Sequence, residues 1–139
     1  MGLTETGRAG TLSAYALNVE GAPYFASDLT DALSAFEAAR GRGAKLIDIG
    51  CMQINHFYHA NAFAEVAEMF DPARNVDYAA RFLLSLYRRE GTWTMAAARY
   101  HAGPNNDAAQ KKYVCRVIGN MVASGFGVWT PEAAVLCQP

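Results

Sequence analysis

Residues 44–59 read AKLIDIGCMQINHFYH, and this stretch decides the fold. The part up to Gly50 is short, branched and apolar, which is typical of a β-strand. The part after it places Gln53 between two apolar residues and then brings Asn55 and several aromatic rings together. Amides that bond hydroxyls and flat rings that stack on sugars are what a carbohydrate site needs. On composition alone, a polar loop over the core is the simpler interpretation.

The residues before this stretch predict further strands and one helix. Residues 11–27 contain short β-prone pieces broken by a turn at residues 21–23. In residues 27–43 the apolar side chains recur at helical spacing, with Ser27 as the expected N-cap and Gly41 as a stop signal. We therefore expect a small sheet of two or three strands beside a helical body.

The residues after it predict helices. Four segments carry apolar side chains at helical spacing, namely residues 61–70, 73–90, 92–102 and 106–127. The second is expected to bury Val76, Ala79, Ala80, Leu83, Leu84 and Tyr87. The last is expected to bury Ala109, Tyr113, Val117 and Met121. The predicted class is mostly α (α+β), a single helical domain over residues 1–139 with a small antiparallel β element.

Composition and charge exclude several classes of protein. A chain of 139 residues with 52% hydrophobic and 18% charged residues is expected to be globular. Its net charge of −1 comes from mixed charges without a basic stripe, so we expect no nucleic-acid partner. No apolar run approaches the roughly 18 residues of a membrane span. Met1 leads directly into polar residues, so we expect either a cytoplasmic protein or a mature or truncated chain.

Cysteines and histidines give weaker signals. The spacing of Cys51, Cys115 and Cys137 matches no zinc ribbon or redox pair, which leaves open either buried free thiols or one disulfide with one free thiol. His56 and His59 lie close together, but no third ligand lies near them. We therefore expect no metal site.

A second unusual stretch is ARYHAGPNN, residues 98–106. A helix is expected to end here with Gly103 in the left-handed conformation, which places Tyr100 and His101 at a corner between two helices. A tyrosine whose hydroxyl is exposed to solvent is often only a residue at the edge of the core.

Three short motifs in order carry a resemblance to a known family. They are Glu5-Thr6, then Gly-Cys-Met-Gln-Ile-Asn at 50–55, then Arg-Tyr-His-Ala-Gly-Pro at 99–104. This order resembles the soluble lytic transglycosylase domain, which has the goose-type lysozyme fold, over about residues 3–123, with 124–139 as a C-terminal extension. The nearest branch is the one found with type IV secretion and flagellar systems. The chain departs from the family pattern by replacing its serine with Thr6, its leucine with Cys51 and its asparagine with His101.

The resemblance implies a peptidoglycan lytic transglycosylase. Glu5 would be the catalytic glutamate, acting first as acid and then as base, to cleave the bond between N-acetylmuramic acid and N-acetylglucosamine and leave a 1,6-anhydro end. No cofactor is implied. The residues that the resemblance places around the substrate are Thr6, Gly50, Met52, Gln53, Asn55, Tyr100 and His101.

Two other functions stay open. If Asp48 positioned a water as a second carboxylate, the enzyme would be a lysozyme-type hydrolase; otherwise Asp48 is expected to cap the strand end or to pair with an arginine. The domain could also be a non-catalytic peptidoglycan-binding module of an assembly machine. The helix expected before Glu5 is missing from the sequence, and a glutamate on a frayed terminus cannot hold a shifted pKa.

The compartment follows from the substrate. Peptidoglycan strands lie outside the cytoplasm, so the resemblance implies a periplasmic protein, with secretion or flagellar proteins as further partners. Oxidising conditions there permit disulfides. On this basis we expect a Cys51–Cys115 disulfide ahead of Cys115–Cys137, which would leave Cys137 free.

Overall fold

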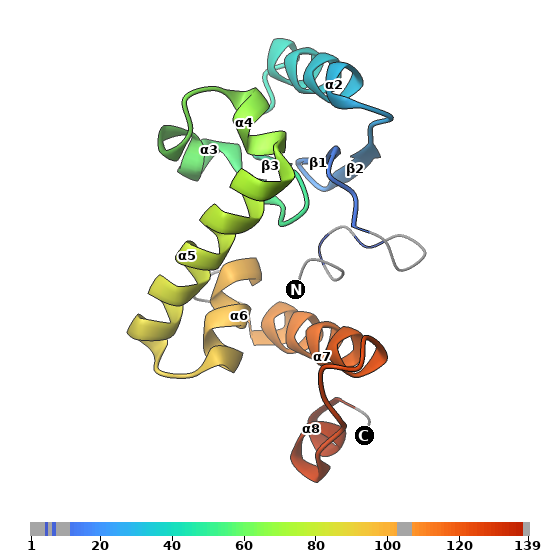
Figure 1. Cartoon of the computed structure of the whole chain (residues 1–139), viewed down its shortest axis with the longest axis vertical. Helices are drawn as coiled ribbons and strands as arrows, with labels where there is room; N and C mark the ends of the chain where they lie inside the picture. Colours follow the sequence, from blue (N-terminus) through green and yellow to red (C-terminus); the bar gives the residue numbers. More distant parts are fainter. Residues whose placement is uncertain (1–4, 6, 8–11, 103–106, 138–139) are drawn as a thin grey trace. The chain divides into compact units, whose positions relative to one another are not determined.

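The computed structural model of the chain describes Glu5, Gly7 and residues 12–102 and 107–137. Thr6 and the expected left-handed Gly103 lie outside these residues. The contacts divide the chain into two compact units, Gly2–Ala79 and Ala80–Pro139, which are described separately (Figure 1). Across the described residues, none of the helices has the length and apolar character needed to cross a membrane.

The first unit is built on a four-stranded antiparallel sheet with the order β2-β1-β3-β4. Its strands are β1 (Ala16–Val19), β2 (Ala22–Phe25), β3 (Ile47–Ile49) and β4 (Ile54–Asn55). Leu17 of β1 is opposite Tyr24 of β2 and Ile49 of β3. The prediction of a small antiparallel element is confirmed, with one strand more than expected because the chain turns back after Gly50 and pairs with β3 again.

A two-residue turn joins β1 to β2. Glu20 and Gly21 have φ angles of 51° and 96°, the left-handed pair that matches the twist of a short hairpin. The Asn18 side chain accepts a hydrogen bond from Gly21 N at 2.8 Å. The expected break in the β-prone segment therefore lies at residues 20–21, one position earlier than the sequence indicated.

Helix α2 (Leu29–Gly41) follows the sheet and buries Ala32, Phe36 and Ala39. The prediction of Ser27 as N-cap was wrong, because Asp28 takes that position and accepts a hydrogen bond from Asp31 N at 2.8 Å. Ser27 instead donates its backbone N–H to the Asp31 carboxylate at 2.9 Å. A carboxylate in the first turn therefore determines which of two adjacent polar residues caps the helix.

The segment predicted as one helix over 61–70 is divided. It contains α3 (His56–His59), a 3-10 turn η1 (Ala60–Ala62) and α4 (Val66–Phe70). Phe63 is extended, and its ring lies 5.1 Å from that of Tyr78. Glu65 is also extended, so the helix begins again only at Val66. An aromatic contact with the next helix thus accompanies the break in the helical pattern.

Helix α5 (Pro72–Glu90) runs from the first unit into the second. Ala79 is buried as predicted, whereas Val76 and Leu84 are 42% and 36% exposed. The polar Asn75 is fully buried on this helix. The buried face therefore includes a position that apolar periodicity alone does not select.

The second unit consists of helices. After the end of α5 come α6 (Trp93–Ala102), α7 (Asp107–Ala123) and α8 (Pro131–Cys137). Ala97, Tyr113 and Val117 form a buried cluster between α6 and α7, and Met121 is 44% exposed against expectation. Glu90 accepts a hydrogen bond from Arg99 at 3.3 Å, an ion pair that ties the end of α5 to α6.

The predicted Cys51–Cys115 disulfide was wrong. Cys115 of α7 is bonded to Cys137 of α8, and Cys51 is a buried free thiol of the first unit. Burial raises the pKa of this thiol, which keeps it protonated. The chain after α7 turns back and brings Cys137 to Cys115, 22 residues away in the sequence. The C-terminal extension is thus attached to the second unit.

We expect α8 to depend on this disulfide, because none of its residues is buried. Reduction, or Cys137→Ser, should speed amide hydrogen exchange in residues 131–137 by at least about tenfold, since the bond contributes several kcal/mol of chain entropy in the usual model. Exchange in α7 should change much less, and Cys51→Ala should leave α8 unaffected. Exchange in α8 that is insensitive to reduction would show that other contacts hold it.

Candidate active site

The loop Gly50–Gln53 forms a tight turn between β3 and β4. Gly50 and Gln53 both have positive φ angles, 80° and 50°. Gly50 N donates to Ala16 O at 2.9 Å, and Gln53 N donates to Gly50 O at 3.0 Å. Backbone hydrogen bonds therefore fix the turn on the sheet. They determine the positions from which the side chains of the turn extend.

Asn75 of α5 holds this turn from the other side. Its Oδ1 accepts from Met52 N at 2.9 Å, while its Nδ2 donates to Ile49 O at 2.9 Å and to Met69 O at 2.8 Å. The side chain is 0% exposed, so these three bonds replace water entirely. Sequence reasoning missed this residue. The available signal was an asparagine one helical turn before the buried Ala79.

Gly50 has no room for a side chain. A Cβ at this position would collide with Asn75 Nδ2 and lie 3.0 Å from Asn75 Cγ and 3.1 Å from Met69 O. Glycine is therefore required at this position for two reasons. Its backbone is left-handed, and the Asn75 side-chain amide leaves no space for a Cβ.

Gln53 is held with a defined orientation. Its Nε2 donates to Gly50 O at 2.9 Å and to Ala16 O at 3.3 Å. Carbonyl oxygens only accept hydrogen bonds, so the NH₂ group must face them and Oε1 must point the other way. The half-buried side chain thus presents an acceptor whose position is set by the sheet.

Asp48 and Asn55 lie opposite each other on β3 and β4. Asn55 Nδ2 donates to Asp48 Oδ1 at 2.9 Å, and Asn55 Oδ1 accepts from Tyr58 N at 3.3 Å as the N-cap of α3. Asn55 was predicted to contact substrate, but both ends of its amide are engaged within the fold. Asp48 pairs with this amide. Burial raises the pKa of the Asp48 carboxyl, and the bond from Asn55 opposes that rise.

Aromatic side chains gather on α3. Phe57 and Tyr58 are 57% and 70% exposed, with ring centroids 5.0 Å apart. His59 Nδ1 lies 2.7 Å from the Tyr78 hydroxyl, and burial lowers the His59 pKa. His56 has a buried Nδ1 without a hydrogen-bond partner. No group of three metal-binding side chains occurs among the residues that the structure describes.

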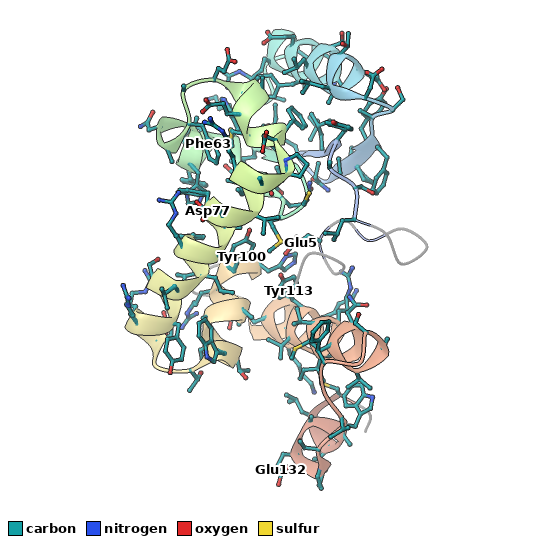
Figure 2. The ribbon with its side chains drawn as sticks, in the orientation of Figure 1. Glu5, Phe63, Asp77, Tyr100, Tyr113 and Glu132 are labelled. Atoms are coloured by element: carbon teal, nitrogen blue, oxygen red, sulfur yellow. A yellow bond between two sulfur atoms is a disulfide. The ribbon has the colours of Figure 1, made fainter. Side chains whose placement is uncertain are left out.

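Glu5, which is labelled in Figure 2, has helical backbone and is partly buried. It belongs to the same unit as Gly50 and Gln53. Tyr100 and His101 belong to the second unit. These two residues contact different helices.

The Tyr100 ring lies 5.6 Å from that of Phe82 on α5. The His101 ring stacks on Tyr113 of α7 at 4.1 Å, with an angle of 2° between their planes. Burial, followed by the nearby Arg116 charge, lowers the His101 pKa, which favours a neutral ring. Ring contacts therefore position both Tyr100 and His101 within the second unit.

We expect Gly50→Ala to lower the free energy of unfolding by about 3 kcal/mol, because it adds left-handed strain and displaces a buried hydrogen bond. Gly43→Ala is the matched control, since Gly43 has a φ of 88° but no atom within 4 Å of an added Cβ. It should cost only about 1 kcal/mol of strain. Urea unfolding measures both, and equal losses would contradict a steric role for Asn75.

A second prediction concerns Asp48→Asn. The folded state holds the Asp48 proton more tightly than the unfolded chain, so the stability from this group is present at low pH and falls as pH rises through the raised pKa. The amide cannot ionise, so the variant should be more stable than the wild type at pH 7. That gain should vanish below the ordinary aspartate pKa of about 3.9.

Asp31→Asn provides a control of opposite sign. Hydrogen bonds from Ser27 and Tyr24 lower the Asp31 pKa, so this variant should lose stability at pH 7. Denaturant titrations over a series of pH values measure both variants. A stability loss for Asp48→Asn at pH 7 would mean that the ionised carboxyl is favoured in the fold.

Comparison with known proteins gives one match. The family model for the transglycosylase SLT domain matches residues 20–119, more than half of the chain. This region contains the turn at Gly50–Gln53, together with Tyr100 and His101, whereas Glu5 precedes it and α8 follows it. Neither a curated protein nor a solved structure matches significantly. The chain therefore belongs to the family of transglycosylase SLT domains, whose members are lytic transglycosylases that act on peptidoglycan.

Proposed function

We propose that this chain cleaves the bond between N-acetylmuramic acid and N-acetylglucosamine in peptidoglycan and leaves a 1,6-anhydro end. The observation that carries the proposal is the turn Gly50–Gln53, which lies inside the region matched by the family model. Asn75 holds this turn, and Gln53 presents an oriented amide oxygen from it. Such an acceptor suits the hydroxyl and amide N–H groups of an N-acetylated sugar.

Glu5 would carry both proton transfers. In the first step its proton passes to the glycosidic oxygen as the bond to the muramic C1 breaks. In the second step the sugar's own 6-hydroxyl oxygen bonds to C1, and its proton returns to Glu5. No water and no cofactor are consumed, and the carboxyl ends in its starting state.

This chemistry requires a protonated carboxyl at the start. Glu5 is partly buried, and the proposal requires surroundings that keep its carboxyl protonated, as apolar surroundings do for catalytic glutamates. Gln53 would orient the sugar. The resemblance adds Met52 as an apolar neighbour, and Thr6, Gly50, Tyr100 and His101 as further sugar contacts.

We further propose a periplasmic location. Peptidoglycan lies outside the cytoplasm, and the Cys115–Cys137 disulfide is typical of oxidising compartments. Service to a secretion or flagellar machine, through local opening of the wall, is the role that the resemblance to that branch suggests.

We expect Glu5→Gln to lower the rate of wall cleavage by at least about 100-fold, because the amide keeps the shape but has no proton to transfer. Binding to purified sacculi should persist. Glu37→Gln, an exposed glutamate on α2, is the matched control and should retain full activity. Zymograms and a soluble-product assay measure the effect, and near-normal turnover of Glu5→Gln would place the acid elsewhere.

A hydrolase is the second candidate. The observation that favours it is Asp48, a half-buried carboxyl with a raised pKa in the strand that leads into Gly50. Its bond to Asn55 favours a structural role instead. Mass spectrometry of the products separates the two, since an anhydro end is lighter than a reducing end by one water. Binding to sacculi without any cleavage would support a non-catalytic assembly module.

A further inference from the structure

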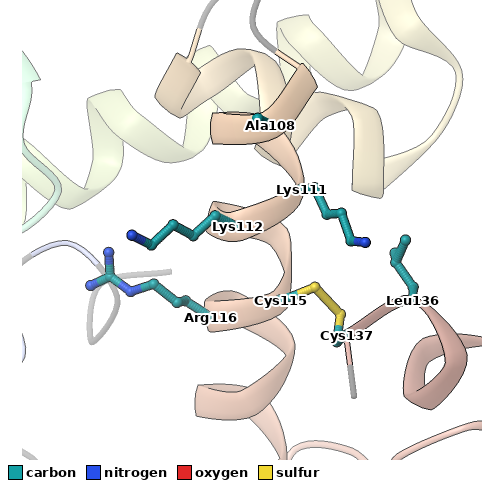
Figure 3. Close-up of a pocket in the computed structure, with 7 residues that line it drawn as sticks. All are labelled: Ala108, Lys111, Lys112, Cys115, Arg116, Leu136 and Cys137. Atoms are coloured by element: carbon teal, nitrogen blue, oxygen red, sulfur yellow. A yellow bond between two sulfur atoms is a disulfide. The ribbon is translucent and has the colours of Figure 1, made fainter. Parts of the chain in front are cut away.

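A pocket of about 540 Å³ lies on α7 beside α8, within the second unit (Figure 3). It is lined by Ala108, Lys111, Lys112, Cys115, Arg116, Leu136 and Cys137. A volume of this order is typical of a site for a small molecule or a few residues of a peptide. None of the proposed catalytic or sugar-binding residues lines it.

Helical spacing gives this pocket an apolar centre and two basic flanks. Ala108 and Cys115 are seven residues apart and lie on one face of α7. Lys111 extends along one flank towards Leu136, whereas Lys112 and Arg116 lie side by side on the other (Figure 3). The Cys115–Cys137 disulfide completes the centre. A ligand on this face would have small apolar groups beneath it and cations on both sides.

The two lysines of the pocket are not neutralised by carboxylates of the described residues. Within the described part of the chain, no ion pair involves Lys111 or Lys112. Lys112 and Arg116 are like charges at i and i+4, an arrangement that destabilises a helix. Lys111 and Lys112 are therefore the charges that the inference assigns to an anionic ligand.

The charge is also unevenly divided along the chain. Residues 80–139 carry seven basic and three acidic side chains, whereas residues 2–79 carry five and ten. The net charge of the whole chain conceals this difference. The pocket therefore belongs to a basic unit, whose field favours anionic ligands.

The outer wall of the pocket lies outside the region that the family model matches. Leu136 and Cys137 belong to α8, and the family model ends at residue 119. Helix α8 has no buried residues, so the disulfide holds this wall in place of a core.

We propose that this pocket binds the short acidic peptides that substitute peptidoglycan strands. Their small methyl side chains suit the centre formed by Ala108 and the disulfide, and their carboxylates suit the lysines on the flanks. The inference rests on the proposed function for its substrate, and it makes the chain selective for strands that carry peptides.

The test is a titration of the full chain with a synthetic stem peptide that has free carboxylates, followed by NMR. The fully amidated peptide is the ligand control. Lys111→Gln with Lys112→Gln should weaken binding about tenfold at low salt, as expected for the loss of two exposed charge contacts. Arg42→Gln with Lys45→Gln removes the same charge from exposed positions in the first unit and should leave binding unchanged.

Three results of the binding experiment would overturn the inference. They are equal binding of the amidated peptide, equal weakening by both double variants, and displacement of the peptide by inorganic phosphate at matched concentration. On the wild-type chain, cleavage of peptide-bearing glycan should exceed that of glycan stripped of peptides, and the lysine variant should lose this preference. Cleavage of both glycans at one rate would refute the inference and leave the proposed function intact, whereas peptide binding without any cleavage would do the reverse.

Discussion

The buried side chain of Asn75 is the interaction on which the first unit depends. One amide satisfies Met52 N, Ile49 O and Met69 O, which belong to the turn, to β3 and to α4. If it were lost, three backbone groups would remain buried without partners, and each would cost about 1–3 kcal/mol. The amide also explains why position 50 is glycine, since any Cβ there meets it. The position of Gln53, and hence of the proposed sugar contact, follows from the same turn.

The periodic elements were predictable because apolar spacing determines them. The helices at 29–41 and 72–90 and the strand before Gly50 lie where the pattern indicates. Two of the errors share a cause, which is competition between polar groups. Asp28 rather than Ser27 caps α2, and a buried asparagine occupies the core face of α5. Such outcomes depend on which partner a polar side chain meets in three dimensions, and hydrophobic periodicity carries no information on it.

The candidate site was predictable to a similar degree. Residues 50–53 were predicted to belong to the site from their mixture of glycine, amide and apolar side chains, and their function stays a prediction. The hydrogen bonds that engage Asn55 within the fold were not predicted. Its amide lies between Asp48 and the N-terminus of α3, and only the register of β3 and β4 reveals this. The disulfide was mispredicted because the return of α8 along α7 has no local sequence signal. Three cysteines permit three pairings, and the fold alone selects one.

The division of charge between the units matches the two kinds of group in a peptidoglycan strand. Sugars offer hydroxyls and amides, which need neutral, oriented partners such as the Gln53 amide rather than charges. Stem peptides offer carboxylates, which need cations, and the cations gather on α7. A cation close to a catalytic glutamate would lower its pKa and oppose proton donation. The proposals therefore assign the sugars to the neutral amide of Gln53 and the peptide carboxylates to Lys111 and Lys112 of α7.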